Sequence, residues 1–484
     1  MLLTGEIIVL SAPLANPSTA THNSVTDWIS DTFEKGIRET MAEQEEPQLW
    51  QTAAPVEFVP HVSERTEAQA LLISTRQGAG YEVAAGQLGH ALQSRATHLL
   101  MDYSQNACAM RYQIDGEWEQ LPPLDREVGD AMLYALKQLC LLNPADRRTA
   151  QTGKCTLKMG KAKHTLTIQA QGVASGERVL TKIEPVDVPF ERLSDLGMRD
   201  KMIETLKEQL DSEGTVVLIT APKATGLTTT WAVTLESADR FIRDFQGFED
   251  QEQPEPETIN INANHFGGDT GLTEPELLRK AILKEPDVFV FPELPQPDSM
   301  ELALEQVAKN QKQIYTRMIA DSALGGLVQL LPKYRDSAGQ LSKTISAVLC
   351  QKLVRRLCDN CKIGFEPQPQ LLKQLGIPAG RVAMLYQPFI PPPIEQQVDE
   401  NGRPAPIIPC HVCAGRGYLG RIAIFELLNP GDQLRAALMK TQDLAKLNQI
   451  AKSEGHRGIQ SEAVLTVARG LTSLEELKRI FASK

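Results

Sequence analysis

Apolar, strand-like segments that alternate with helix-like segments are the feature of this chain that most constrains its fold. Strands that are apolar along their length are buried on both faces, and strands separated by helices pair in parallel. The sequence therefore predicts an α/β domain with a mainly parallel sheet over residues 191–345. The predicted strands are TVVLIT at 215–220, TINI at 258–261, DVFVF at 287–291 and QIYTRMI at 313–319.

The region before this domain has a different pattern. Alternating runs at 107–114 and 164–170 predict strands, and the stretch 128–142 predicts a helix between them. The dipeptide Asp115-Gly116 is typical of a hairpin turn. Residues 56–190 therefore predict a small α/β domain. Residues 1–55 are polar apart from a helix-like stretch at 28–41, which predicts a variable, partly disordered arm.

The region after the parallel sheet contains two C-x-x-C pairs. Apolar residues between 341 and 357 recur at helical spacing, which predicts a helix leading into the first pair. The proline-rich segment 387–409 separates the pairs and predicts an extended, solvated excursion. Residues 346–430 are therefore interpreted as one module, followed by a helical segment at 431–484.

The paired cysteines indicate a metal site. Two C-x-x-C pairs supply four thiolates, and a tetrahedral site closed by protein ligands is typical of structural Zn²⁺. In a chain of 484 residues without a secretory pattern, paired cysteines favour metal over a disulfide framework. The alternative is two reduced, metal-free turns, which leave little to order the excursion. The expected zinc ligands are Cys358, Cys361, Cys410 and Cys413.

The segment APKATGLT at 221–228 has the layout of a phosphate-binding loop, with a buried strand before it and a helix starting near Thr228. A working loop reads G-x-x-x-x-G-K-[ST], and only Gly226 and Thr228 match it. Leu227 replaces the lysine that holds the β- and γ-phosphates. Lys223 is a candidate substitute. On this segment alone, an ordinary strand-to-helix turn is the simpler interpretation.

Longer motifs point to a family. The segments QKLVRRLCDNC and CHVCAGRGYLGRIAIFELL closely resemble the zinc-module signature of type II secretion and type IV pilus assembly ATPases. The segment GLTEPELLRKAILKEPDVFVFPEL resembles the stretch that leads into their Walker B motif, and YQIDG, ADRRTAQTGK and GERVLTKI resemble their N-terminal domain. These motifs occur in the family's order and cover about residues 95–484.

The resemblance implies a fold and a set of site residues. The fold is a RecA-like P-loop NTPase domain preceded by a small PAS-like α/β domain and followed by the zinc module and helical tail. Glu293 matches the Walker B glutamate and Glu249 the glutamate of the acidic box, so both are catalytic candidates. For each glutamate the alternative is a solvated surface charge. The nucleotide-binding candidates are Lys223, Thr225, Gly226, Thr228, Thr229, Arg111, Arg147 and Arg148.

Several positions depart from the family pattern. Ala221 and Ala224 occupy glycine places, and an alanine costs on the order of 1 kcal/mol wherever the loop needs φ > 0. Met318 stands at a histidine position and Pro292 at the Walker B glycine. Because phosphoryl transfer depends on positioning and charge, these losses bear on one step and predict weak or absent ATP hydrolysis.

Three functions follow from this pattern. The leading one is a weakly active or inactive subunit of a pilus or secretion machine. The alternatives are a working motor with a rebuilt phosphate loop, and an interaction scaffold that binds no nucleotide. ATP and Mg²⁺ are cofactors only in the first two cases, whereas structural Zn²⁺ is expected in all three.

Charge and the resemblance together set the expected partners. The net charge of -11 disfavours nucleic acid, which is bound through a surplus of lysine and arginine. The N-terminal apolar run contains Glu6 and has no basic flank, which favours a cytoplasmic start over a secretory signal. The resemblance implies a homo-hexamer, or a mixed ring with an active paralogue, that contacts an inner-membrane platform protein from the cytoplasm.

Overall fold

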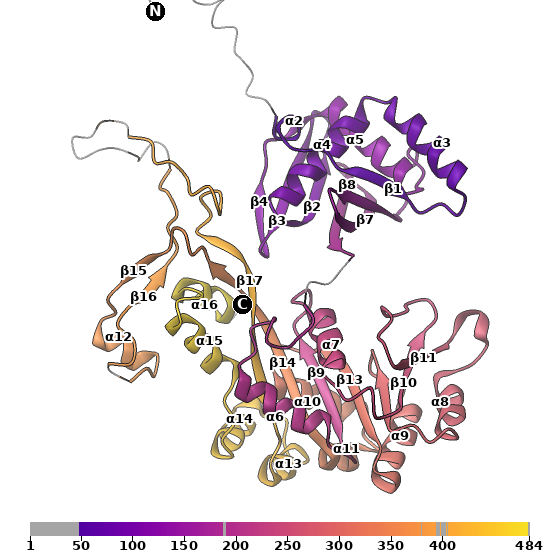
Figure 1. Cartoon of the computed structure of the whole chain (residues 1–484), viewed down its shortest axis with the longest axis vertical. Coiled ribbons are helices and arrows are strands. Elements are labelled where there is room, and N and C mark those ends of the chain that lie inside the picture. Colours follow the sequence, from indigo (N-terminus) through magenta and orange to yellow (C-terminus); the bar gives the residue numbers. More distant parts are fainter. Residues whose placement is uncertain are drawn as a thin grey trace, which may run out of the picture.

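The chain folds around two large β-sheets (Figure 1). The computed structural model describes residues 48–186, 190–378, 380–393, 397, 403 and 405–482. The helix predicted at 28–41 and most of the predicted N-terminal arm lie outside these residues. No helix in the described part of the chain is long and apolar enough to cross a membrane.

The first sheet is antiparallel, and helices α4 and α5 pack on it through a shared apolar core. The strand predicted at 107–114 is confirmed as β3, and Asp115 and Gly116 form the predicted turn with φ of 51° and 91°. In sheet order the strands are β1 (Glu57–Pro60), β6 (Gln151–Met159), β7 (Ala162–Val173), β8 (Gly176–Pro185), β2 (Ala96–Tyr103), β3 (Ala107–Ile114) and β4 (Glu117–Gln120), with β5 (Leu124–Asp125) beside β3. The helices are α2 (Leu49–Thr52), α3 (Arg65–Arg76), α4 (Gly80–Gln93) and α5 (Arg126–Leu139).

The second sheet is parallel except at one edge, as the sequence predicts. In sheet order it contains β11 (Ile261–Phe266), β10 (Phe245–Asp250), β12 (Val288–Phe291), β13 (Gln313–Ile319), β9 (Val216–Ala221), β14 (Ile345–Leu357) and the antiparallel β17 (Tyr418–Leu428). Its helices are α6 (Asp200–Leu210), α7 (Leu227–Glu236), η1 (Gly268–Thr270), α8 (Glu274–Ile282), α9 (Pro297–Asn310), α10 (Ala323–Lys333) and α11 (Ala338–Thr344).

The central strand β9 is buried on both faces, which places the loop that follows it. Val216 and Leu218 pack with helices α8 to α10 on one face. Val217 and Ile219 pack with α6 and α7 on the other face. Because consecutive side chains of a strand point to opposite faces, one apolar run serves both cores.

The helix predicted over 341–357 is wrong from residue 345 onward, because the helix α11 ends at Thr344. Residues 345–357 form the strand β14, which pairs with β9 on one side and β17 on the other. Nearly continuous burial explains the error, because a run that is apolar on both faces mimics helical spacing when it is read without its neighbours. The segment predicted as a strand at 258–261 ends where β11 begins, and β10 has no counterpart among the predicted strands.

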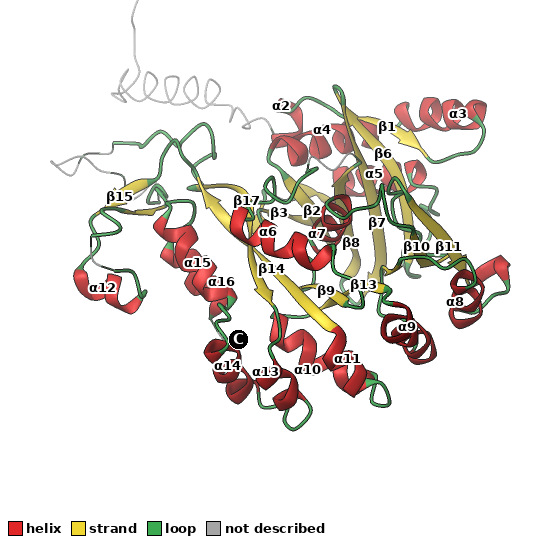
Figure 2. Cartoon of the chain, turned by 60° about the horizontal axis from the view of Figure 1, so that its bottom comes forward, coloured by secondary structure: helices red, strands yellow, loops and turns green. Residues whose placement is uncertain are grey.

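The C-terminal part continues from the edge of the second sheet. A small two-stranded sheet is formed by β15 (Ile363–Phe365) and β16 (Leu385–Gln387), and α12 (Pro369–Gln374) lies between them in the chain. The predicted helical tail is present as α13 (Asp432–Leu438), α14 (Leu444–Ser453), α15 (Ile459–Ala468) and α16 (Leu474–Phe481). Figure 2 shows α15 and α16 along β14 and β17. Part of the proline-rich segment lies outside the described residues.

Candidate nucleotide and metal sites

The loop between β9 and α7 has a left-handed backbone at two positions. Gly226 has φ of 91° and is the N-cap of α7. Ala224, at a glycine place of the family pattern, has φ of 61°, a left-handed conformation that costs an alanine about 1–2 kcal/mol. Ala221, at the other glycine place, is the buried last residue of β9. The loop therefore turns through two left-handed residues, one of which is an alanine in a strained conformation.

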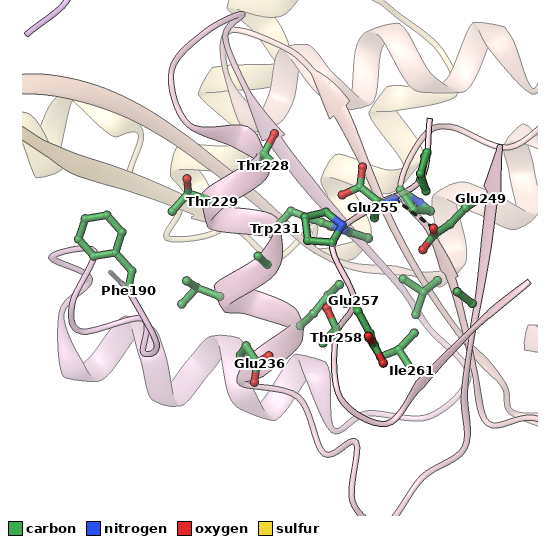
Figure 3. Close-up of a pocket in the computed structure, with 18 of the residues that line it drawn as sticks. Phe190, Thr228, Thr229, Trp231, Glu236, Glu249, Glu255, Glu257, Thr258 and Ile261 are labelled. Carbon is green, nitrogen blue, oxygen red and sulfur yellow. Dashed lines mark hydrogen bonds between the residues drawn. The ribbon is translucent and has the colours of Figure 1, made fainter. Parts of the chain in front are cut away.

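The side chains of this loop differ in whether they face solvent, the core or a neighbouring cavity. Lys223 is exposed and makes no ion pair with the described residues, and Leu227 packs against the core under α7. Thr225 turns back, because its Oγ1 donates to the carbonyl oxygen of Pro222 at 2.7 Å. Thr228 and Thr229, on the first turn of α7, are among the residues that line a neighbouring cavity (Figure 3). Of the predicted loop residues, these two threonines are the ones that line it.

The cavity has a volume of about 1110 Å³ and lies between α7, residues 254–258 and strands β10 and β11. Its wall is rich in carboxylates and contains aromatic and aliphatic surface from residues such as Phe190 and Trp231. Arg192 is the only arginine or lysine among the described residues that line it. The lining carboxylates are those of Glu191, Glu236, Glu249, Glu255 and Glu257.

Hydrogen bonds and an ion pair connect Glu249, Glu255 and Arg317 at this cavity. The backbone N–H of Glu255 donates to Glu249 Oε2 at 3.1 Å (Figure 3). Arg317 of β13 makes a two-point ion pair with Glu255, at 2.5 and 2.9 Å, and its guanidinium lies 5.5 Å from the centre of the Trp231 ring. Arg317 does not line the cavity itself but holds Glu255, which does, and the sequence reasoning missed it because no motif marks it.

The two predicted catalytic glutamates are placed differently. Glu249 is half-buried and lines the cavity. Glu293 is exposed just after β12 and is not among the lining residues, although its neighbour Pro292 is. Its carbonyl oxygen accepts a hydrogen bond from Thr316 Oγ1 at 3.2 Å. The catalytic role of either glutamate stays a prediction.

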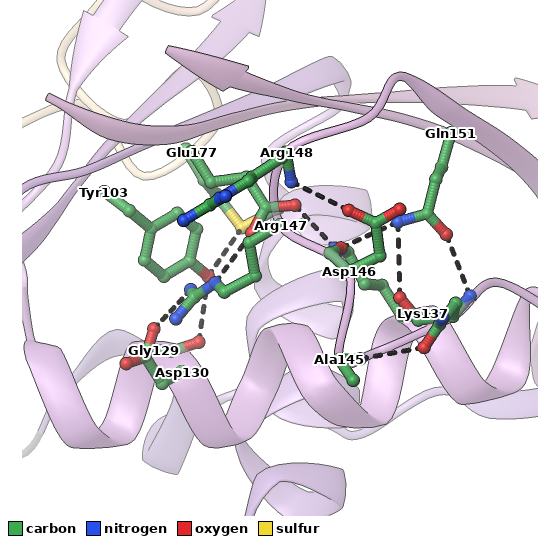
Figure 4. Close-up of polar contacts among 12 residues, drawn as sticks. Tyr103, Gly129, Asp130, Lys137, Ala145, Asp146, Arg147, Arg148, Gln151 and Glu177 are labelled. Atoms are coloured by element: carbon green, nitrogen blue, oxygen red, sulfur yellow. Dashed lines mark hydrogen bonds and ion pairs between the residues drawn. The ribbon is translucent and has the colours of Figure 1, made fainter. Parts of the chain in front are cut away.

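The predicted arginines of the first sheet do not line the cavity. Arg111 pairs with Asp102 at 2.8 Å, and Arg147 pairs with Asp130 at 2.6 Å and with Glu177 at 2.9 Å (Figure 4). Arg148 is exposed and makes no ion pair within the described part of the chain. Arg111 and Arg147 therefore act as structural partners in this conformation.

A buried lysine supports the segment that carries Arg147. Lys137 is fully buried, pairs with Glu177 at 2.5 Å and donates to the carbonyl oxygen of Asp146 at 2.6 Å. Arg147 lies over the ring of Tyr103 at 5.5 Å, and burial raises the pKa of that tyrosine well above its usual value. The network therefore ties α5, β8 and the loop after α5 together (Figure 4).

The four predicted zinc ligands converge. The sulfur atoms of Cys358, Cys361, Cys410 and Cys413 lie within 4.8 Å of one another. Two of the Sγ–Sγ separations are 3.9 and 3.6 Å. A tetrahedral site with Zn–S bonds of about 2.3 Å requires sulfur atoms about 3.8 Å apart.

Neighbouring groups complete this arrangement. Asn360 Nδ2 donates to Cys410 Sγ at 3.2 Å, and the backbone N–H of Gly417 donates to Cys413 Sγ at 3.3 Å. Such donors stabilise thiolates and orient them toward a metal. The cluster fits a metal such as zinc.

The second sheet, with a strand–loop–helix unit at its centre, defines an α/β fold that matches the structure of a known ATPase, and the four cysteines cluster in the C-terminal part of the chain. A family model described as "Type II/IV secretion system protein" matches residues 81–479. The chain belongs to this family.

Individual relatives are distant in sequence. The type IV pilus assembly ATPase PilB of Thermus thermophilus is 26% identical over 386 residues, which are 79% of this chain and 41% of the relative. The type II secretion system protein E of Pseudomonas aeruginosa is 23% identical over 393 residues, 81% of this chain and 74% of the relative. The chain thus spans less than half the length of the Thermus relative.

Solved structures include ATPases with a comparable fold. The Legionella pneumophila ATPase DotB superposes with a TM-score of 0.51 at 13% identity, over 82% of this chain and 94% of DotB. At this identity the match supports the fold and leaves the activity open.

Proposed function

We propose that this chain is a subunit of a secretion or pilus-assembly machine that hydrolyses ATP weakly or not at all. The observation that carries the proposal is the loop between β9 and α7. Leucine stands where the phosphate-binding lysine belongs, and Lys223 points to solvent instead of into the cavity. A transferring phosphoryl group therefore lacks the cation that normally neutralises its developing charge.

The charge of the cavity supports the same proposal. Glu249, Glu255 and Glu257 repel a polyphosphate unless Mg²⁺ lies between them. Arg317 pairs with a carboxylate of the cavity wall and is one candidate substitute for the missing cation, but Glu255 already neutralises it. ATP with Mg²⁺ is therefore a weak ligand in this proposal, and Thr228 is the hydroxyl that would contact the magnesium.

The proposal extends to domains and assembly. Residues 191–345 form the RecA-like nucleotide-binding domain, residues 56–190 the PAS-like domain, and residues 346–430 the zinc module, with Zn²⁺ on the four cysteines. The subunit joins a homo-hexamer or a mixed ring with an active paralogue, on the cytoplasmic face of an inner-membrane platform protein. The names of the Thermus and Pseudomonas relatives support a pilus or secretion role.

The deciding experiment is ATP turnover by the purified chain beside its Glu293→Gln variant. We expect both preparations to give the same residual phosphate release, which is then contamination. Turnover at a rate normal for the family that the variant abolishes contradicts the proposal and indicates a motor with a rebuilt loop, whereas slow turnover that the variant abolishes identifies the weakly active form. In that case Lys223→Ala tests the substitute, because loss of turnover assigns the missing charge to Lys223.

A binding experiment separates a weak ATPase from a scaffold. Titration with a fluorescent ATP analogue and Mg²⁺ gives saturable binding if the loop still accepts phosphate. The variant Ala224→Gly/Leu227→Lys restores two positions of a working loop, and we expect it to bind the analogue at least tenfold more tightly. The matched control Ala224→Gly/Leu227→Met relieves the backbone without adding the charge.

A further inference from the structure

The β3–β4 hairpin of the first sheet contacts the segment that follows the second cysteine pair. Figure 1 shows this hairpin near the top of β17. Asp115 Oδ2 accepts a hydrogen bond from the backbone N–H of Gly420 at 3.1 Å. Glu119 pairs with Arg416 at 2.6 Å, and Glu117 pairs with Arg479 of α16. The hairpin thus presents three carboxylates to the C-terminal part of the chain.

Two of these carboxylates project from the same face of strand β4. Glu117 and Glu119 are two residues apart on β4, so their side chains point the same way. The facing surface is basic, because Arg416 and Arg479 lie there with Arg421, whose side chain comes within 4.0 Å of a Cβ placed on Gly116. The two surfaces are complementary in charge.

Arg416 belongs to the turn that holds the second cysteine pair. The backbone N–H of Arg416 donates to the carbonyl oxygen of Cys413 at 3.1 Å, and the N–H of Gly417 donates to Cys413 Sγ at 3.3 Å. Cys358 closes the other side, since its N–H donates to the carbonyl oxygen of Gly417 at 3.0 Å. The position of Arg416 therefore depends on where the sulfur atoms lie.

Arg479 is held in another way. Glu476 of α16 is fully buried and pairs with Arg479 at 2.6 Å and with Arg355 of β14 at 2.7 Å. No cysteine takes part in these contacts. The hairpin therefore has one anchor next to the tetracysteine cluster and one anchor independent of it.

We propose that metal in the tetracysteine site docks the first-sheet domain onto the rest of the chain, and that the docked partner is the β3–β4 hairpin of the same chain. The pair between Glu119 and Arg416 is half-exposed, and such pairs are weak unless both side chains are already in place. The metal supplies this preorganisation by fixing the turn at Cys413. The inference does not depend on ATP hydrolysis.

The test is amide hydrogen exchange of the full-length chain with and without Zn²⁺. After a chelator removes the metal, we expect exchange at 117–120 and 415–420 to accelerate at least tenfold, and small-angle scattering to give a larger radius of gyration. Adding Zn²⁺ back should reverse both changes. Unchanged exchange at 117–120 after proven metal loss overturns the proposal.

Variants keep the test informative if metal removal unfolds the chain. In the zinc-loaded protein, Glu119→Gln and Arg416→Gln should each accelerate exchange at 117–120, and the double variant should add little to either, with zinc content unchanged. The control Glu184→Gln alters an exposed carboxylate that pairs locally with Lys182, and it should leave 117–120 unaffected. Additive effects of Glu119→Gln and Arg416→Gln would overturn the intrachain docking. Faster exchange at 117–120 when the unmodified protein is diluted would also overturn it, because the hairpin would then dock on a second copy of the chain.

Discussion

At the scale of single residues, the loop between β9 and α7 contains an alanine whose backbone conformation is strained by its Cβ atom. Ala224 adopts a left-handed conformation, whereas Ala221 lies in a regular strand. The sequence pattern marks both as glycine places, and the structure assigns the strain to one of them. Near the same loop, the predicted catalytic Glu249 is engaged by the backbone of Glu255.

Ala224→Gly should raise the free energy of unfolding by up to about 1 kcal/mol, because glycine adopts φ of 61° without a Cβ penalty. Urea denaturation checks this value. The control Ala221→Gly should lower the free energy of unfolding, because glycine weakens a buried strand. Equal effects of the two variants would contradict strain at residue 224.

Arg317→Met should destabilise the chain by about 1–3 kcal/mol, because it leaves the partly buried carboxylate of Glu255 without its cation. The double variant Arg317→Met/Glu255→Gln should cost less than the sum of the two single variants. A thermodynamic cycle of the four proteins, measured by urea denaturation, gives this coupling. Strict additivity would mean that the pair contributes nothing to stability.

At the scale of elements, buried ion pairs join segments that are far apart in the chain. Lys137 of α5 and Glu177 of β8 form one such pair, and it supports the loop with Arg147. Glu476 of α16 forms another with Arg355 of β14. Removing one partner of a buried pair is costly because the other charge stays buried.

Lys137→Met should lower the free energy of unfolding by about 3–5 kcal/mol, because Glu177 loses one of its two cations in a fully buried place. The exposed Lys161→Met is the matched control and should change stability by less than about 0.5 kcal/mol. Thermal unfolding of the purified variants distinguishes the two. A small effect of Lys137→Met would show that the loop rearranges to hydrate Glu177.

The stabilising contribution of Glu476, which fixes α16 to β14, should depend on pH. Burial raises the pKa of Glu476, but hydrogen bonds and charge from Arg479 and Arg355 outweigh burial and hold it below its usual 4.5. Since the pKa is depressed in the folded state, this stabilisation is present above pH 4.5 and is lost as the pH falls through the folded pKa. Glu476→Gln should therefore lower the unfolding temperature at pH 7, with a difference that shrinks as the pH falls below 4.5. A difference independent of pH would contradict the ionic contribution.

At the scale of the whole molecule, the two sheets meet through exposed or half-exposed ion pairs. Arg416 and Glu119 have side chains 24% and 36% exposed, and Arg479 and Glu117 have side chains 36% and 41% exposed. Such pairs are screened by salt, unlike the buried pair of Lys137 and Glu177. The relative position of the two sheets is therefore the part of the structure most sensitive to ionic strength.

Raising NaCl from 0.1 M to 1 M shortens the screening length from about 10 Å to about 3 Å. We expect the radius of gyration of the metal-loaded chain to increase over this range, while its circular dichroism stays constant. Small-angle scattering at several salt concentrations measures this change. A constant radius would show that these ion pairs do not set the relative position of the two sheets.

The sequence by itself determined the features that depend on local chemistry. The parallel sheet follows from apolar runs between helices, the hairpin follows from Asp115 and Gly116, and the cluster of four cysteines follows from their paired spacing. Each is encoded within a few residues, or in the spacing of one residue type. These features were therefore predicted correctly.

Only the tertiary structure decided which partners each residue meets. Residues 345–357 are a strand because β9 and β17 flank them, although their own spacing suggests a helix. Arg111 and Arg147 are engaged by carboxylates of their own sheet region, and Arg317 reaches a glutamate 62 residues away in the chain. Contacts between distant segments leave no periodic signal in the sequence, because their energy arises only once the sheets have formed.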